Sequence, residues 1–182
     1  MQTIRQLDLI LSELADKEHF MFSLGDLRGI NPDQTKGAFR VLISRAVKNG
    51  LLKRICRGLY LYPKVSFETG LVLYHAAARL RAHEFNYLSL ESVLSDTGVI
   101  SQIPMNWITL MSSGRSNIID CGAFGHIEFI HTKNIPAALA CELTYDFRCH
   151  LWRASIKQAV KDMKRTRRNT DLINWETANE FI

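Results

Sequence analysis

The sequence predicts an α+β protein in two domains, and three observations support this prediction. Residues 1–64 alternate helical and strand-like patterns in the order helix, short strand, helix, turn, helix, hairpin. Residues 65–182 open with helical segments, continue with several strand-like segments and return to a helical pattern near the end. The apolar content of 47% in 182 residues is enough for one large core or two small ones. We therefore place a domain boundary after residue 64.

Composition limits the class of protein. No apolar run approaches membrane-spanning length, and the first 20 residues read as a charged amphipathic helix rather than a signal peptide. Four scattered cysteines, with no CxxC pair, are expected to be reduced and mostly structural. We expect a cytoplasmic protein that does not associate with a membrane.

The first three elements precede residue 31. Residues 3–17 place apolar side chains at helical spacing, which predicts an amphipathic helix. Its buried stripe would be Ile4, Leu7, Ile10, Leu11 and Leu14. The segment "HFMFS" predicts a short extended piece, and Ser23 is a suitable N-cap for a short helix that would stop at Gly29.

A third helix and a hairpin follow. Asn31 is predicted as the N-cap and Pro32 as the first helical residue, with Asn49-Gly50 ending the helix. The predicted buried face is Phe39, Leu42, Ile43, Ala46 and Val47. The segments "LLKRI" and "LYLYP" read as two short strands joined by "CRG". This order of elements is that of a winged helix-turn-helix, in which the third helix enters the major groove and the hairpin lies on the backbone or minor groove.

Positive charge coincides with this motif. The segment from Arg28 to Lys64 contains nine cationic residues and one acidic residue, Asp33, for a net charge of +8. The whole chain carries +5. Localised positive charge indicates a polyanionic partner, and long polar side chains on the third helix reach base edges and phosphates. The predicted DNA-contacting residues are Gln34, Thr35, Lys36, Arg40, Ser44, Arg45 and Lys48 on the helix, and Lys53, Arg54 and Arg57 on the hairpin, or wing. Phe39, Leu42, Val47 and Tyr60 would hold this geometry from inside. A winged helix used for protein contacts is the alternative.

The second domain reads as mixed α/β. Residues 66–82 predict a helix, and Ser89 is a candidate N-cap for another that stops at Gly98. Strands are predicted within 106–113, 116–121 and 126–132, with a further one within 141–152. A helix over 153–168 follows, and Trp152 and Trp175 are interpreted as core anchors.

No catalytic or metal-binding pattern stands out. His126 and His131 flank a strand, and Cys149 precedes His150, but neither pair has the spacing of a zinc site. The segment "SSGRS" lacks the Walker pattern and reads as a turn. We expect no enzyme activity, no cofactor and no metal.

Four motifs carry a resemblance to a known family. They comprise Arg57, Gly58, Leu59 and Tyr60; Tyr87, Leu88, Ser89, Ser92 and Leu94; Gly125, Ile127, Phe129 and His131; and Ala154, Ser155, Gln158, Ala159, Val160 and Asp162. In this order and spacing the sequence resembles the AbiEi family of antitoxins, transcriptional regulators of abortive-infection toxin–antitoxin systems. A departure is Ile156, where the family often has Pro.

The resemblance implies a function. The chain would be a DNA-binding antitoxin that represses its own operon at inverted repeats in the promoter. It would counter a nucleotidyltransferase-like toxin, generally without a stable complex, and residues 65–182 would form the antitoxin domain. Two alternatives are a module that neutralises a toxin or other partner by direct contact, and an RNA-modifying enzyme.

A second basic segment lies near the C-terminus. Residues 148–168 carry eight cations and one acid, Asp162, for a net charge of +7, and the rest of the chain outside both basic segments carries −10. This helix could be a solvated face, a second phosphate contact, or a nucleic-acid surface linked to toxin control. The candidate accessory nucleic-acid surface is Lys157, Lys161, Lys164, Arg165 and Arg168.

Overall fold

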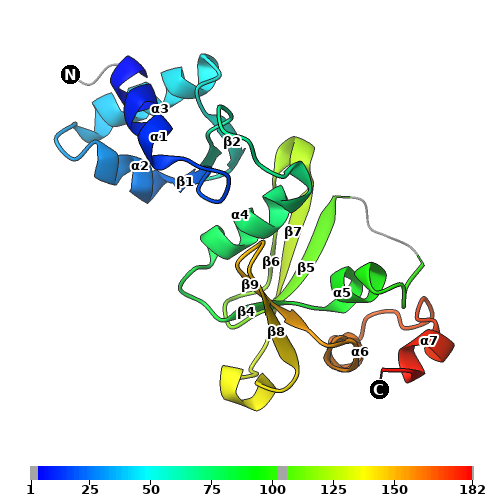
Figure 1. The fold of residues 1–182 in the computed structure, drawn as a ribbon. Helices are drawn as coiled ribbons and strands as arrows, with labels where there is room; N and C mark the ends of the chain where they lie inside the picture. Colours follow the sequence, from blue (N-terminus) through cyan, green and yellow to red (C-terminus); the bar gives the residue numbers. More distant parts are fainter. Residues whose placement is uncertain (1–3, 102–105, 182) are drawn as a thin grey trace. The chain divides into compact units, whose positions relative to one another are not determined.

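The computed structural model describes residues 4–101 and 106–181, which form two compact units divided between Val72 and Leu73 (Figure 1). The chain just after residue 64 packs with the first unit. Val65 lies against its core, and the ring of Phe67 stacks on Phe20 with 4.8 Å between centroids. The contact boundary therefore falls later in the chain than the boundary that sequence predicts.

The first unit has the element order expected of a winged helix-turn-helix. Its helices and strands are α1 (Ile4–Leu14), β1 (Met21–Ser23), α2 (Leu24–Ile30), α3 (Lys36–Lys48), β2 (Lys53–Cys56), β3 (Leu59–Leu61) and the 3-10 helix η1 (Thr69–Leu71). The strands form an antiparallel sheet in the order β1-β3-β2. The predicted start of α1 at residue 3 lies outside the described residues.

One apolar core holds the three helices and the sheet together. It contains Leu7, Leu11, Phe22, Leu27, Phe39, Leu42, Ile43, Ala46, Leu51, Leu52 and Tyr62. Four of these residues come from α3 at helical spacing, so burying them fixes which face of α3 points outward. Val47 and Tyr60, predicted to support the fold from inside, are partly buried and pack against this core.

Helix α2 begins as predicted and ends later than predicted. The Ser23 hydroxyl accepts a hydrogen bond from the Asp26 amide (3.0 Å), and the Asp26 carboxylate accepts one from the Ser23 amide (2.8 Å). This capping box satisfies two amide groups that a helix start leaves without partners. The predicted stop at Gly29 is wrong, because the helix continues to Ile30 and its C-cap is Asn31.

Helix α3 starts later than the sequence pattern suggests. The predicted N-cap, Asn31, is 1% exposed and its side-chain amide donates to the carbonyl of Leu27 at 2.8 Å. The observed N-cap is Thr35, whose hydroxyl accepts from the Ala38 amide at 3.3 Å. Asn31 is therefore used to end α2, and Pro32 lies in the turn between the two helices. The predicted end is confirmed, with Asn49 as C-cap and Gly50 at φ +73°.

The second unit is built on a six-stranded mixed sheet. Its elements are α4 (Val72–Leu80), β4 (Asn86–Leu88), α5 (Leu90–Asp96), β5 (Trp107–Ser112), β6 (Asn117–Asp120), η2 (Gly122–Phe124), β7 (His126–His131), η3 (Pro136–Leu139), β8 (Leu143–Asp146), β9 (Leu151–Ala154), α6 (Ile156–Arg165) and α7 (Trp175–Asn179). The strand order is β6-β7-β5-β4-β9-β8, with β5 parallel to β7 and β4 parallel to β9. With the first unit, this confirms the α+β class.

Two details of this unit differ from the prediction. Residues 141–152 form a two-stranded hairpin, β8 and β9, and the turn between them holds His150 at φ +56°. The interpretation of Trp152 and Trp175 as core anchors is wrong, since their exposed fractions are 43% and 40%. Trp152 packs edge-on against Tyr145, and Trp175 lies beneath the ammonium group of Lys164.

A buried carboxylate links α6 to the sheet. Asp162 is 0% exposed and accepts hydrogen bonds from Ser89 Oγ (2.8 Å), the Tyr87 hydroxyl (3.0 Å) and Gln158 Nε2 (3.0 Å). Arg165 Nη2 lies 2.9 Å from Oδ1 of the same carboxylate. Burial raises the pKa of Asp162, and burial beside this carboxylate raises the pKa of Tyr87 to about 12. Ser89 is the N-cap residue of α5, yet its hydroxyl is directed to Asp162 instead of to a helix amide.

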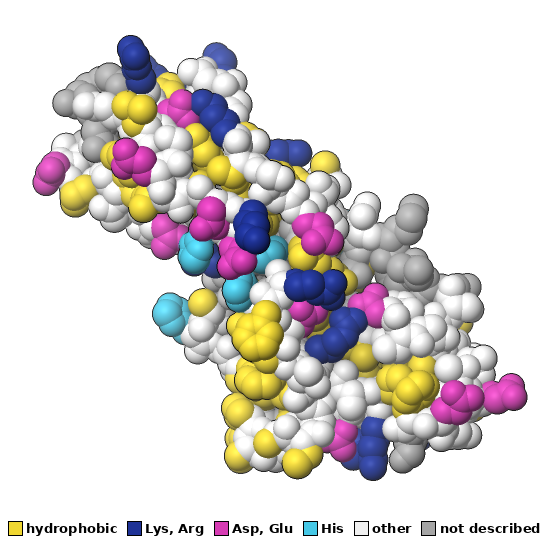
Figure 2. Space-filling view, viewed as in Figure 1, with side chains coloured by type: hydrophobic (Ala, Val, Ile, Leu, Met, Phe, Trp, Pro, Cys, Tyr) yellow, Lys and Arg dark blue, Asp and Glu magenta, His cyan; other side chains and the backbone are white. Residues whose placement is uncertain are grey.

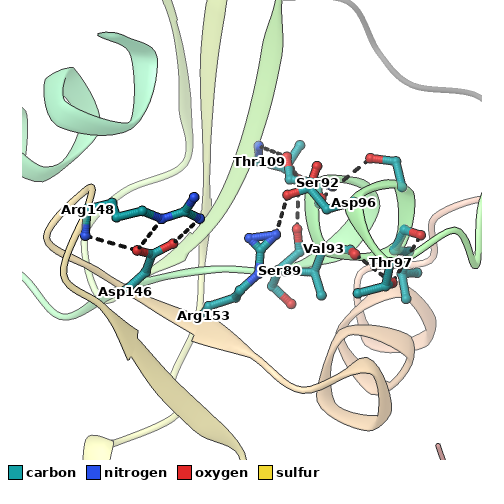
Figure 3. Close-up of polar contacts among 11 residues, drawn as sticks. Ser89, Ser92, Val93, Asp96, Thr97, Thr109, Asp146, Arg148 and Arg153 are labelled. Atoms are coloured by element: carbon teal, nitrogen blue, oxygen red, sulfur yellow. Dashed lines mark hydrogen bonds and ion pairs between the residues drawn. The ribbon is translucent and has the colours of Figure 1, made fainter. Parts of the chain in front are cut away.

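Further side-chain bonds hold α5 against the sheet. Ser92 Oγ accepts from the Thr109 amide at 2.8 Å, and the Thr109 hydroxyl donates to the Ser89 carbonyl at 2.9 Å (Figure 3). Arg153 on β9 pairs with Asp96 at the end of α5 (Figure 3). The second unit is thus joined across its elements by buried and half-buried polar contacts as well as by its apolar core.

Candidate nucleic-acid interface

Helix α3 presents a polar and cationic face to solvent. Phe39, Leu42, Ile43 and Ala46 are buried, so the residues opposite them on the helix are directed outward. The exposed members of the predicted set on this helix are Lys36, Arg40, Ser44, Arg45 and Lys48. The structure therefore brings these five residues together on one surface of the first unit.

The two predicted contact residues that precede the helix are differently placed. Thr35 is exposed, but its oxygen is already used as the helix cap, so only its hydroxyl proton remains for a ligand. Gln34 is half-buried, and its side-chain oxygen is buried without a hydrogen-bond partner among the described residues. Neither side chain is presented in the same way as the exposed side chains of α3.

The wing carries its cations on one strand and at the turn. Ile55, Leu59 and Leu61 are buried and fix the hairpin to the unit. Lys53, Arg54 and Arg57 are exposed, and Arg54 Nε donates to the Cys56 carbonyl at 3.2 Å. The strand register shifts between Arg54 and Cys56, which marks a bulge in β2.

Gly58 allows the wing to turn directly after Arg57. Its φ is +82°, a conformation that residues with a side chain rarely adopt. Its carbonyl accepts a hydrogen bond from the Leu24 amide at 2.8 Å, which ties the wing to the start of α2. The Arg57 side chain is therefore held at an exposed and anchored turn.

The positive charge of this surface is not neutralised within the described part of the chain. Lys36, Arg40, Arg45, Lys48 and Arg57 have no acidic partner among residues 4–101 and 106–181. Lys64, by contrast, lies 2.6 Å from Asp8 on α1, and Arg28 lies over the Phe39 ring. Figure 2 shows Lys and Arg side chains, together with some Asp and Glu side chains, on the visible face of this unit. Exposed cations without partners attract a polyanion over a range set by the ionic strength.

The accessory surface predicted on α6 is only partly assembled. Arg165 contacts Asp162, Asn134 and Thr132, and Arg168 bridges Glu91 (2.9 Å) and Glu128 (2.5 Å). Lys164 lies 5.0 Å from the centre of the Trp175 ring. Lys161 is exposed and Lys157 is half-buried, and neither has an acidic partner among the described residues. Arg165 and Arg168 are therefore engaged in holding the second unit together.

The other candidate groups do not form a reaction centre. Within the described residues no three His, Cys, Asp or Glu side chains come close enough to share a metal ion. His126 Nε2 lies 4.0 Å from Asp120, and its ring stacks on Trp107. Cys149 is buried, and burial raises the pKa of its thiol to about 11, which disfavours the reactive thiolate.

The predicted set of polar residues does not include Val41, a large apolar residue on the outer face of α3. Its side chain is 50% exposed. The helical period could have found it, since Val41 lies opposite the buried positions that the same period identifies. The cationic face therefore includes one large apolar side chain.

Comparison with known proteins bears on this surface. Residues 10–63 match the model of a family described as transcriptional regulator, AbiEi antitoxin. The match runs from within α1 to the end of the wing and so includes the whole cationic surface. No curated protein matches the chain. Among the described residues no helix is long and apolar enough to cross a lipid bilayer. The N-terminal winged helix is therefore similar to that of transcriptional regulators of the AbiEi antitoxin family.

Proposed function

We propose that this protein is a DNA-binding antitoxin that represses its own operon by binding inverted repeats in the promoter and counters a nucleotidyltransferase-like toxin. The observation that carries the DNA-binding part is the surface formed by α3 and the wing. Five of its cations, Lys36, Arg40, Arg45, Lys48 and Arg57, have no acidic partner among the described residues. A surface with no anionic ligand would be expected to carry acidic residues among its cations, because unpaired like charges repel one another.

The two elements have different roles in this proposal. Helix α3 lies in the major groove, where Arg40, Ser44 and Arg45 reach base edges, while Lys36 and Lys48 neutralise phosphates. The wing places Arg54 and Arg57 on the adjacent backbone or minor groove, with Lys53 at the start of its first strand. Thr35 and Gln34 enter the groove with the N-terminus of α3, and Thr35 donates its hydroxyl proton to a phosphate.

The experiment is a gel shift with full-length protein on the duplex that lies upstream of its own gene. Arg40→Ala and Arg57→Ala should each weaken binding at fixed salt, because each removes an exposed cation that no described residue pairs. Lys17→Ala is the matched control, since Lys17 is exposed outside α3 and the wing. Unchanged affinity in both arginine variants, with the same folding by circular dichroism, would exclude this surface.

The toxin part of the proposal has its own test. The antitoxin and the product of the adjacent gene are co-expressed, and growth is compared for the wild type and Arg40→Ala. If toxin antagonism does not need DNA binding, Arg40→Ala protects the cells while losing repression of a promoter reporter. A toxin without nucleotidyltransferase activity would contradict the proposed toxin class.

Neutralisation by direct contact is the second candidate function. The observation that favours it is an exposed aromatic group on the β8–β9 hairpin, where Phe147 is 78% exposed beside Tyr145 and Trp152. Figure 2 shows hydrophobic side chains over this part of the second unit. Stable co-purification with the toxin that Phe147→Ala abolishes would support direct contact, and the absence of a complex would support antagonism without one.

A further inference from the structure

Val41 lies at the centre of the outer face of α3. Successive residues of an α-helix are rotated by about 100°. The row directly opposite the buried residues therefore consists of Gly37, Val41, Ser44 and Lys48. Val41 is 50% exposed, and within the described helix α3 it is the one large apolar residue whose side chain is exposed. The part of the helix that would enter deepest into a groove therefore carries an isopropyl group between cationic neighbours.

Packing does not explain this valine. Its side chain is directed away from the core cluster to which Phe39, Leu42, Ile43 and Ala46 belong. A β-branched residue at a solvent-exposed helix position lowers helix stability relative to Lys, Gln or Ala, because the turn restricts its χ1 angle. The fold of the first unit alone would therefore favour another residue at position 41.

Gly37, one turn earlier in the helix, is also a residue that the fold does not require. A Cβ built on Gly37 meets no atom within 4 Å, and its φ lies outside the left-handed region, so the fold does not require glycine here. Glycine in a helix also costs stability relative to alanine. The missing side chain lets the backbone of the first turn come close to a surface that lies against this face, and Val41 is the next residue along the row.

We propose that Val41 is a specificity-determining residue that contacts the C5-methyl group of a thymine in the major groove of the operator. This inference rests on the proposed function, since it requires α3 to lie in that groove. A thymine is recognised in the major groove by its O4 acceptor and its methyl group, and short apolar side chains contact the methyl. Ser44 and Arg45 supply polar contacts on either side, and Val41 supplies the contact that excludes water from the methyl group.

The test uses full-length protein and the duplex upstream of its own gene. Footprinting first locates the bound half-sites, and each thymidine in a half-site is then replaced singly by deoxyuridine, which removes the methyl and keeps the base pair. At one position per half-site, the wild type should lose affinity about fourfold, the factor expected for one methyl returned to water. Val41→Ala should bind the unmodified duplex with a similarly reduced affinity. Replacing that thymidine by deoxyuridine should not reduce the affinity of Val41→Ala further.

Controls separate this inference from the proposed function. Leu9→Ala removes another exposed apolar side chain, 59% exposed on α1, and should respond to deoxyuridine as the wild type does. If Val41→Ala retains the full wild-type response at every position, or loses affinity equally on all duplexes, the methyl contact is excluded while DNA binding stands. If the wild type does not bind the upstream duplex, both the inference and the proposed function fail.

Discussion

The hydroxyl group of Tyr62, at the exit of the wing, donates a 2.8 Å hydrogen bond to Oδ1 of Asp8 on the first helix. Lys64 Nζ lies 2.6 Å from Oδ2 of the same carboxylate. The Lys64 hydrogen bond, and then the Tyr62 one, lower the pKa of Asp8, while burial beside Asp8 raises the pKa of Tyr62 to about 12. Tyr62 is 1% exposed, so this contact joins α1 to the end of β3 from inside the first unit.

Tyr62→Phe should therefore destabilise the first unit. The substitution removes a hydrogen bond to a charged acceptor, so the free energy of unfolding should fall by about 1.5 kcal/mol. Tyr60→Phe is the matched control, because the Tyr60 hydroxyl has no hydrogen-bond partner among the described residues, and it should change stability little. Urea unfolding is followed by far-UV circular dichroism, since all three tryptophans lie in the second unit. Equal stability of the two variants would contradict the role of the Asp8 contact.

Asp162 should make the stability of the second unit depend on pH. Burial raises its pKa above the unfolded value near 3.8, so the native state binds more protons than the unfolded state between the two pKa values. The free energy of unfolding contributed by this group should fall as the pH rises through that window. The measurement is urea unfolding followed by tryptophan fluorescence at a series of pH values for the wild type and Asp162→Asn. The difference in free energy of unfolding between the wild type and Asp162→Asn should change with pH from about 3.8 upward. A difference that stays constant with pH would contradict the prediction.

Two glycine substitutions in the first unit should have opposite effects. Gly58→Ala places a side chain at φ +82° and should cost about 1 kcal/mol, because the left-handed conformation strains a residue with a Cβ. Gly37→Ala lies in a helix with open space around its Cβ and should raise stability by up to about 1 kcal/mol. Both are measured by urea unfolding with circular dichroism. A stabilising effect of Gly58→Ala would show that the wing turn tolerates another conformation.

Arg168→Ala should destabilise the second unit, whereas Lys161→Ala should not. Arg168 bridges Glu91 and Glu128, and the side chains of all three are less than one quarter exposed. Its removal leaves two largely buried carboxylates without the cation between them, at a cost of about 2 kcal/mol. Lys161 is an exposed residue of the same segment, and its loss should stay within about 0.5 kcal/mol. Similar values for the two variants, from tryptophan fluorescence in urea, would argue against a structural role for Arg168.

Local patterns predicted the first unit well because its signals lie close together in sequence. The apolar spacing of α1, the Ser23 cap and the Asn49-Gly50 stop each depend on a few neighbouring residues. The spacing identified the buried Leu7 and Leu11, but its prediction that Leu14 is buried was wrong, since Leu14 is 53% exposed at the end of the helix. The start of α3 could not be read in this way, since Asn31 and Thr35 are both good caps. The choice is made by the burial of Asn31 and its bond to Leu27.

The charged surfaces differed in how far sequence could predict them. The outward face of α3 follows from its buried face, so the exposure of Lys36, Arg40 and Arg45 was predictable from the helical period. The ion pairs of the basic residues near α6 could not be predicted from sequence, because the partners of Arg165 and Arg168 come from distant segments around residues 91 and 128–134. Trp152 and Trp175 were misplaced for a related reason: a large apolar residue is normally taken as buried, and its neighbours are known only from the fold.

The most direct test of the central claim is the salt dependence of DNA binding by full-length protein on its upstream duplex. Equilibrium constants are measured at several salt concentrations for the wild type, Arg57→Ala and Lys17→Ala. If Arg57 neutralises a phosphate, its loss should reduce the slope of log K against log salt by about 0.9, and Lys17→Ala should keep the wild-type slope. Identical slopes for the wild type and Arg57→Ala, or a wild-type affinity that does not respond to salt, would contradict a DNA interface on the wing and α3.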